Sequence, residues 1–352
     1  MLLSFVMERT AYREAGVDIS KLDRFRAIGL EVSRSTLIPE VEEISYGRFF
    51  LNLKKASECF EYPVEKNETD GIGTKQDLAA TFGWNVVAGE DIVTCNVSDI
   101  LRHGAVPYTF ALDFSFSDVS DEVFQDVMNG VCQACKESGV TLVAGETAQM
   151  PNVYKEGSYD LMGTASGIVE RERLLCPEKV QEEDVILGLA SSGLHTNSYS
   201  LATKIIEDGK ISLEMKLPPF SKNLAETLLI PERNYTGAFL DLFKSRLEIH
   251  QIEHIAGGGL TGRLEKIGSE NMSAVVKHNS WKIQPIFEYL SKWGQIENEE
   301  MLATFNMGVG MVVVLPDKEV AQVRAGFEKH GLESWIIGKV AKRQEDKVLY
   351  IK

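Results

Sequence analysis

Short apolar runs alternate with longer amphipathic stretches along this chain, and this alternation limits the fold more than any other feature of the sequence. Residues 185–190 and 311–315 are apolar runs of strand length, so we expect two buried strands there. Apolar residues at helical spacing predict further helices over 198–207, 235–244, 260–267 and 320–330. Strands that alternate with helices predict mixed α/β layers.

The first half of the chain shows both patterns as well. Apolar residues at helical spacing predict helices over 20–34, 86–103 and 121–138. Two further segments, 141–144 and 160–169, have the composition of short strands. The first half therefore also mixes helices and strands.

The texture of the sequence changes after Glu170, where acidic turns become frequent between the apolar runs. A chain of 352 residues corresponds to two domains at roughly 150 residues each. We therefore expect an N-terminal domain over 1–168 and a C-terminal domain over 169–352, each large enough to bury a core.

Charge and hydropathy exclude several kinds of partner. The chain has 37 basic and 52 acidic residues, a net charge of −15, which argues against nucleic-acid binding because phosphate contacts need clustered Lys and Arg. Its longest wholly apolar stretch, 311–315, is far shorter than the ~18 residues of a membrane-spanning helix. Residues 1–7 lack a basic leader, so we expect no signal peptide. The five cysteines are sparse, which fits reduced thiols in the cytoplasm.

Two familiar motifs carry little weight here. The G-x-x-x-x-G-K-[ST] phosphate loop is missing, and the glycine-rich segment 257–262 lacks the acidic ribose ligand of a dinucleotide site, which favours a flexible turn or a phosphate contact. Cys132 and Cys135 form a C-x-x-C pair, but structural zinc needs four ligands. Buried helix cysteines are the better interpretation of that pair.

A more informative segment covers residues 69–75. Asp70 offers a carboxylate, while Gly71 and Gly73 allow the backbone to approach a phosphate closely. Thr74 and Lys75 add a hydroxyl and an ammonium group. The segment therefore suits a phosphate held with Mg²⁺, although an Asp-Gly turn with a solvated lysine explains it as well.

Two more carboxylates extend this pattern. Asn96 and Asp99 share one face of a predicted helix that is otherwise apolar, and a carboxylate there needs a cation or a donor. Glu146 and Thr147 directly follow the strand predicted at 141–144. A surface pair of Asp99 with a nearby histidine and a polar turn at Glu146 are the alternatives. The three carboxylates together suit Mg²⁺ shared with phosphates.

A loop of small polar residues at 191–199 lies between a predicted strand and a predicted helix. Such a loop before a helix N-terminus binds anions, and a histidine in it can donate to phosphate or carry a proton. The residues concerned are Ser191, Ser192, Gly193, His195 and Asn197. An ordinary helix cap with an exposed histidine is the alternative.

Several ordered motifs together resemble the phosphoribosylformylglycinamidine cyclo-ligase family, also called aminoimidazole ribonucleotide synthetases, over nearly the whole chain. The motifs are 12–18, 69–75, 104–107, 145–151, 191–199, 230–235, 257–259 and 305–310. Their order along the chain makes the set far more specific than any one of them.

The resemblance implies a fold and a reaction. The fold is a two-domain α+β and α/β protein, in which the N-terminal domain closes a β-barrel across a homodimer and binds ATP without a P-loop. The reaction converts formylglycinamidine ribonucleotide and ATP into aminoimidazole ribonucleotide, ADP and phosphate, through a phosphorylated imidate. It belongs to purine biosynthesis.

The resemblance also implies roles for the motif residues. ATP would be bound by Asp70, Gly71, Gly73, Thr74, Lys75, Asn96, Asp99, Glu146 and Thr147. Mg²⁺ would be bound by Asp70, Asp99 and Glu146. The substrate would be bound by Ser191, Ser192, Gly193, His195 and Asn197, and the catalytic residues would be His195, Lys75 and Asp99.

The chain departs from the family in places. Tyr46 and Arg48 flank Gly47 where the family has a glycine-rich phosphate loop, and Gln149 stands in place of a glutamate. Residues 96–99 look closer to thiamine-monophosphate kinase and selenophosphate synthetase, so another ATP-dependent phosphoryl-transfer enzyme of the superfamily is an alternative. A degenerate nucleotide-binding paralogue is a third, disfavoured because the charged motif residues are retained.

Overall fold

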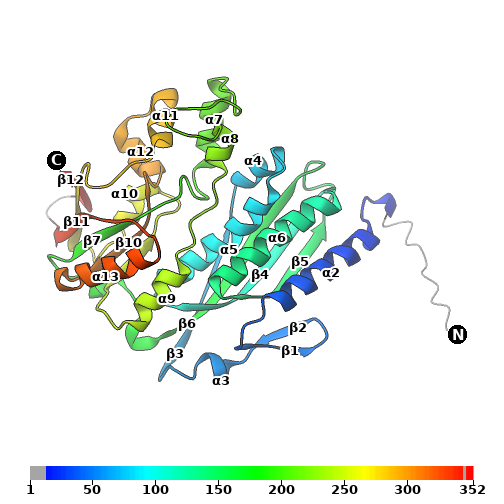
Figure 1. Cartoon of the computed structure of the whole chain (residues 1–352), viewed down its shortest axis with the longest axis horizontal. Coiled ribbons are helices and arrows are strands. Elements are labelled where there is room, and N and C mark those ends of the chain that lie inside the picture. Colours follow the sequence, from blue (N-terminus) through cyan, green and yellow to red (C-terminus); the bar gives the residue numbers. More distant parts are fainter. Residues whose placement is uncertain (1–12, 344–345, 352) are drawn as a thin grey trace.

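The structure, a computed structural model, describes residues 13–343 and 346–351. The expectation about residues 1–7, and Tyr12 of the first motif, lie outside these described residues. Two sheets with packed helices make up the two halves of the molecule (Figure 1). Mixed α/β layers are therefore confirmed.

The N-terminal half is built on a four-stranded sheet. Its strands, in spatial order, are β3 (Pro63–Gly71), β6 (Tyr159–Glu170), β4 (Val106–Phe116) and β5 (Thr141–Gln149). Strand β6 pairs antiparallel with β3 and β4, whereas β4 and β5 are parallel. One face is covered by the helices α2 (Ile19–Ser35), α5 (Asn85–Leu101) and α6 (Asp121–Ser138) (Figure 1).

The packing between α5 and α6 explains why glycine occurs inside both helices. A Cβ on Gly89 would lie 2.0 Å from the carbonyl oxygen of Val127, and one on Gly130 would lie 2.0 Å from that of Val86. Only glycine allows the two backbones to approach so closely. This contact fixes α5, which carries the polar groups described below.

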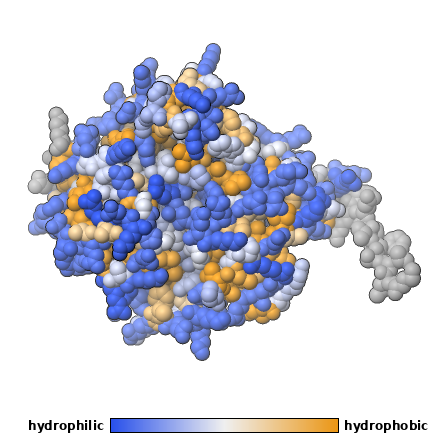
Figure 2. Space-filling model, in the orientation of Figure 1, coloured by the Kyte–Doolittle hydropathy of each residue, from blue (hydrophilic) through white to orange (hydrophobic). Residues whose placement is uncertain are grey.

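The opposite face of the four-stranded sheet is largely uncovered. Thr69 and Thr164 share a hydrogen bond of 2.8 Å there, and Met162 on β6 is 42% exposed. The hairpin of β1 (Val41–Ser45) and β2 (Arg48–Leu51) turns at Gly47 and exposes Tyr46. Figure 2 shows orange patches of hydrophobic residues on a mostly hydrophilic surface.

The C-terminal half contains a six-stranded sheet. Its strands, in spatial order, are β12 (Val348–Ile351), β9 (Met272–Lys277), β11 (Ser334–Lys342), β7 (Val185–Ala190), β10 (Val309–Leu315) and β8 (Gln251–His254). Every residue of β7, β10 and β8 is buried. The helices of this half are α7 (Tyr199–Asp208), α8 (Leu224–Leu228), α9 (Thr236–Lys244), α10 (Gly259–Leu264), α11 (Pro285–Gly294), α12 (Asn298–Thr304) and α13 (Asp317–Lys329).

The structure confirms the predicted helices but contains a strand that the sequence does not predict. All seven predicted helices exist, and α6 has its predicted bounds because Ser120 caps its start and Gly139 ends it in the left-handed region. Strand β3 is missed because its polar sequence gives no apolar run. Two predictions are wrong in detail: residues 69–71 belong to β3, and residues 145–147 continue β5, because β6 and β4 supply hydrogen-bonding partners there.

Candidate functional site

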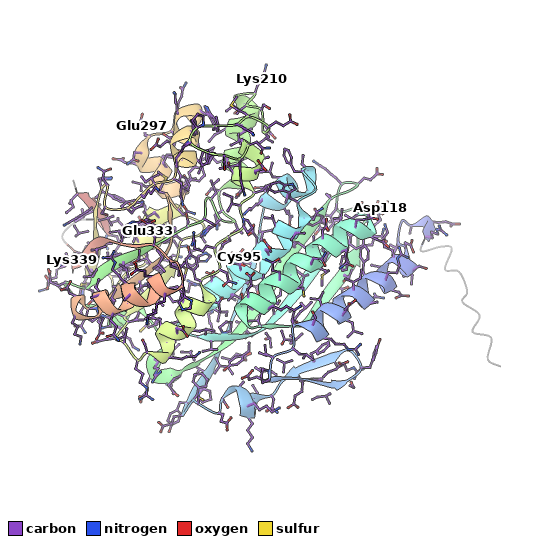
Figure 3. All side chains as sticks on the ribbon, in the orientation of Figure 1. Cys95, Asp118, Lys210, Glu297, Glu333 and Lys339 are labelled. Carbon is purple, nitrogen blue, oxygen red and sulfur yellow. The ribbon has the colours of Figure 1, made fainter. Side chains whose placement is uncertain are left out.

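Charged side chains from the two halves meet at a buried junction beside α5. Figure 3 labels Cys95 on this helix, in the middle of the molecule. Burial raises the pKa of the Cys95 thiol, and nearby carboxylates, Glu232 first among them, raise it further. The junction therefore gathers negative charge from both halves around one apolar helix.

Lys75 and Asp91 form an ion pair at this junction. Lys75 begins α4 (Lys75–Thr81), and its Nζ lies 2.6 Å from Asp91 Oδ2 on α5. The side chains are 1% and 0% exposed. Lys75 Nζ also donates to the carbonyl oxygen of Ile230 at 2.8 Å and lies over the ring of Tyr199. The ammonium group of Lys75 is thus fully occupied within the chain.

Glu232 lies next to this ion pair, in the irregular segment between α8 and α9. Its backbone N–H donates to Asp91 Oδ1 at 2.7 Å. Its Oε2 accepts from Thr196 Oγ1 at 3.0 Å, and its Oε1 lies 3.0 Å from His254 Nε2. Glu232 therefore contacts α5, the 191–199 loop and β8 at once.

His254 is held between two carboxylates. Its Nδ1 lies 3.1 Å from Asp99 Oδ1 on α5, opposite the Glu232 contact. Burial disfavours the charged ring, but Glu232 and Asp99 outweigh burial and raise the pKa of His254 to about 10. Conversely, burial is outweighed at Asp99, where His254 and Arg102 lower the pKa of the carboxyl. His254 is accordingly an imidazolium at neutral pH.

Asp70 lies at the end of β3, close to Asp99. The side chain of Asn96 on α5 accepts from the backbone N–H of Asp70 at 2.9 Å and donates to its carbonyl oxygen at 3.2 Å. Burial raises the pKa of Asp70, and the charge of Asp99 raises it further. The predicted grouping of Asp70, Asn96 and Asp99 is therefore present in the structure.

The 191–199 loop lies on the same junction, and most of its polar groups bind the chain itself. Ser191 contacts Asn306, Ser192 Oγ donates to the carbonyl oxygen of Pro231, and Asn306 donates to that of Gly193. Asn197 is half-buried and donates to the neighbouring Thr196 hydroxyl. The hydroxyls of Ser191 and Ser192 are thus occupied.

His195 is fully buried in this loop rather than exposed at a cap. Its φ of 62° lies in the left-handed region, which is strained for a residue with a side chain. Its Nε2 accepts from the backbone N–H of Ser192 at 3.1 Å, which leaves the proton of the neutral ring on Nδ1. Burial lowers the pKa of His195 to about 3, so the ring is a neutral donor.

The structure does not bring Glu146 to the other two carboxylates within one chain. Asp70, Gly163, Leu112 and Gly145 are in register across the sheet, so the strands of Asp70 and Glu146 are three spacings, about 14 Å, apart. Glu146 pairs with Asp113, which alternates with core residues and faces away from the helices. Glu146 therefore belongs to the uncovered side of the sheet, whereas Thr147 pairs with the core residue Phe114 and belongs to the side of the helices.

The other residues of the 69–75 motif lie at the edge of the junction. Gly71 ends β3, and Gly73 has a φ of 56° that glycine tolerates. Gly73 and Thr74 are exposed, and the hydroxyl of Thr74 contacts that of Ser200 on α7.

Three residues of this junction are not predicted from the sequence, namely Asp91, Glu232 and His254. Asp91 gives the signal used for Asp99, a carboxylate within an apolar helix, and could have been found the same way. Glu232 and His254 give no local signal, because their partners lie far away in sequence. Within 13–343 and 346–351, His195, Glu232 and His254 are also the group that offers three ligand atoms within 4.8 Å of one another.

Comparisons with known proteins match both halves of the chain. Residues 67–169 match the family described as AIR synthase related protein, N-terminal domain, and residues 181–351 match the corresponding C-terminal domain. The phosphoribosylformylglycinamidine cyclo-ligase of Thermodesulfovibrio yellowstonii is 37% identical over 96% of this chain and 98% of its own. That of Bacillus subtilis is 35% identical over 94% and 96%.

Two solved structures share the fold. Thiamine-monophosphate kinase from Stenotrophomonas maltophilia aligns with a TM-score of 0.65 at 19% identity, covering 95% of this chain and 96% of its own. HypE of E. coli aligns with a TM-score of 0.66 at 14% identity, covering 94% and 93%. Among the described residues, no helix is both long and apolar enough to cross a bilayer.

Proposed function

This chain belongs to the phosphoribosylformylglycinamidine cyclo-ligase family, and on that premise we propose that it converts formylglycinamidine ribonucleotide and ATP into aminoimidazole ribonucleotide, ADP and phosphate. The identity of 37% over nearly the full length of both chains carries this proposal. The junction supports it, because Asp99 of one half contacts His254 of the other, and His254 is linked to the 191–199 loop through Glu232. The reaction is a step of purine biosynthesis.

The reaction needs ATP and formylglycinamidine ribonucleotide held next to each other. ATP transfers its terminal phosphoryl group to the formamide oxygen, the amidine nitrogen then attacks that carbon, and phosphate leaves as the ring closes. Both steps develop charge on oxygen atoms, so they need fixed donors and cations. A junction between two domains can present these groups from opposite sides.

Asp70 and Asp99 are the proposed Mg²⁺ and ATP ligands of this chain. Burial and then the charge of Asp99 raise the pKa of Asp70, so a cation bound beside both carboxylates would stabilise the charged form of Asp70. Oxygen ligands shared with phosphates suit Mg²⁺, which would supply positive charge to the phosphates of ATP. Asn96 would act by fixing the backbone of Asp70, and Gly71, Gly73 and Thr74 would line the phosphate side.

Lys75 takes a different role in this proposal. Its ammonium is buried against Asp91 and Ile230, so it would hold α4 and α5 against the C-terminal half rather than touch phosphate. His195 would donate from Nδ1 as a neutral ring, and Asn197 and the backbone of Gly193 would complete the substrate side. Ser191 and Ser192 would act by shaping the loop.

A homodimer belongs to the proposal as well. The uncovered face of the four-stranded sheet carries Met162 and Glu146, and a second copy packed against it would close the barrel that the family resemblance implies. The N-terminal unit, 1–168, would then bind ATP and dimerise, and the unit 169–352 would contribute the substrate loop. Free cysteines fit a cytoplasmic setting.

The decisive experiment measures ADP and aminoimidazole formation by the purified chain with MgATP and formylglycinamidine ribonucleotide. We expect both products in equal amounts, together with rescue of a purine auxotroph that lacks the cyclo-ligase. ADP formed only with another acceptor, such as thiamine monophosphate, would assign the chain to the second branch of the superfamily. Nucleotide binding without any turnover would favour the paralogue.

A further inference from the structure

Glu232 is the residue through which the two sides of the junction meet. On one side it reaches Asp99 through His254, with contacts of 3.0 Å and 3.1 Å. On the other side it accepts from Thr196 of the 191–199 loop at 3.0 Å. The three contacts form one chain from α5 to the loop, with Glu232 in its centre.

The charge of Glu232 is needed for this chain of contacts. The residue is 4% exposed, and a buried carboxylate is costly unless charged and hydrogen-bonding partners surround it. His254 supplies a positive charge beside Oε1, and the hydroxyl of Thr196 donates to Oε2. The backbone N–H of Glu232 donates to Asp91. A neutral residue at position 232 would remove the negative charge that holds the His254 ring in place.

Glu232 and the two histidines near it resemble a metal site, but the protons on the histidine rings do not suit a metal. His195, Glu232 and His254 each offer a ligand atom within 4.8 Å of the others. However, the Ser192 N–H points at Nε2 of His195, so the proton of this neutral ring sits on Nδ1, where a metal would bind. The charge of His254 already compensates Glu232. The nitrogen atoms that a metal would need therefore carry protons instead.

We propose that Glu232 is a positioning residue that couples the nucleotide side of the site to the substrate side. By holding His254 it fixes Asp99, and by holding Thr196 it fixes the loop that carries His195. Occupation of one side then changes the affinity of the other, and linkage requires the effect to be reciprocal. This inference rests on the proposed function, because it assigns Asp99 to ATP and the loop to the substrate.

The test measures binding of MgADP by calorimetry, with and without saturating formylglycinamidine ribonucleotide. In the native chain we expect the substrate to change the MgADP dissociation constant by at least about fivefold. Glu232→Gln keeps the shape but not the charge, and should bring this ratio close to one. In turnover assays it should raise KM for both ligands, because both sides lose their alignment.

Glu253→Gln is the matched control. Glu253 precedes His254 on β8 and is 6% exposed, but it bonds to Gln251 rather than to the junction. This variant should keep the native ratio. Thr196→Val separates the loop contact from folding, since it removes one hydroxyl at nearly constant volume; it should lower the ratio while leaving MgADP binding alone unchanged.

Several outcomes would overturn the inference. A native ratio of one, or equal ratios in Glu232→Gln and Glu253→Gln, would remove the coupling role. If Glu232→Gln fails to fold, an unchanged ratio of MgADP dissociation constants in Thr196→Val would also remove the coupling role. Stoichiometric zinc in the purified chain that is lost in Glu232→Gln would make the cluster a metal site. A native chain that forms no aminoimidazole would instead refute the proposed function.

Discussion

The junction beside α5 and the uncovered face of the four-stranded sheet both carry residues of the predicted ATP site, yet they differ in how those residues are held. At the junction, Asp91, Asp99 and Glu232 each have a partner from another element. On the uncovered face, Glu146 accepts a hydrogen bond from the backbone N–H of its own neighbour, Thr147. One region is organised by contacts between elements, and the other is open to solvent.

This difference has an energetic consequence. Charges buried at the junction have lost their hydration and depend on one another, so removing one partner leaves the other uncompensated. Groups on the uncovered sheet face keep their water until another surface covers them. Substitutions at the junction should therefore affect folding of one chain, while those on the open face should affect assembly.

The largest expected effect comes from breaking the buried ion pair. Lys75→Met should lower the free energy of unfolding by about 3–5 kcal/mol, because Asp91, at 0% exposure, would lose its cation and would have to stay charged without it or bind a proton. Urea unfolding of the native and variant chains measures this. A loss below about 1 kcal/mol would mean that water or another group replaces the ammonium.

Two controls sharpen that measurement. The double variant Lys75→Met with Asp91→Leu removes both charges and should recover much of the loss. Lys204→Met breaks an exposed pair with Asp208, whose side chains are 68% and 67% exposed, and should change stability by less than about 1 kcal/mol.

The second prediction compares carboxylates from the two regions. Asp99→Asn should lower kcat by about 10²–10³, the effect of losing one charged group aimed at the transition state. Circular dichroism should show an unchanged fold, because His254 keeps its contact with Glu232 when Asp99 loses its charge. Glu146→Gln should lower kcat only in a dimer, if the partner copy completes the site. Normal turnover by Asp99→Asn would remove Asp99 from the ATP site.

The third prediction tests the uncovered face directly. Met162→Lys places a charge in the middle of β6, where a second copy would pack, and should convert a dimer into a monomer in sedimentation experiments. Ile336→Lys is the control, since Ile336 is 41% exposed, close to the 42% of Met162, but lies on β11 of the other half. Loss of the dimer in the control but not in Met162→Lys would place the interface elsewhere.

The sequence predicts the local parts of this molecule better than the contacts between its halves. Helix α6 follows from its apolar spacing and its caps, and Asp70 and Asp99 follow from carboxylates placed among glycines or apolar residues. By contrast, β3 is an edge strand with a polar sequence, whose partner β6 lies about a hundred residues further on. No local pattern encodes that pairing.

The contacts of Glu232 and His254 show the same limit at the site. His254 meets Asp99 across 155 residues of sequence, and Glu232 meets Asp91 across 141. Their chemistry arises only when the two halves are packed together, which fixes their charges and desolvates them. The resemblance to a family can locate such residues as motifs, but their partners come from the structure.

The smallest expected effect comes from Glu90, the neighbour of Asp91 on α5, because, among the residues that the structure describes, Glu90 lacks the cation that Asp91 has. Asp91 has Lys75, whereas Glu90 is half-buried and has no side-chain hydrogen bond or ion pair within the described chain. Burial raises the pKa of Glu90 to about 7, with Asp91 and Glu137 adding to it. In the unfolded chain the pKa returns to its ordinary value of 4.5. The folded state therefore holds this proton more tightly.

The sign of the pH dependence follows from that difference. Below pH 4.5 the group is protonated in both states and costs nothing; between pH 4.5 and 7 stability falls as pH rises, and the loss is complete above 7. Glu90→Gln should thus be more stable than the native chain at pH 8, by about 1 kcal/mol after allowing for solvent screening. Urea unfolding at pH 8 and pH 4 measures the difference, which should vanish at the lower pH. Glu137→Gln should give part of the same gain, and a gain from Glu90→Gln that persists at pH 4 would show that packing rather than charge is responsible.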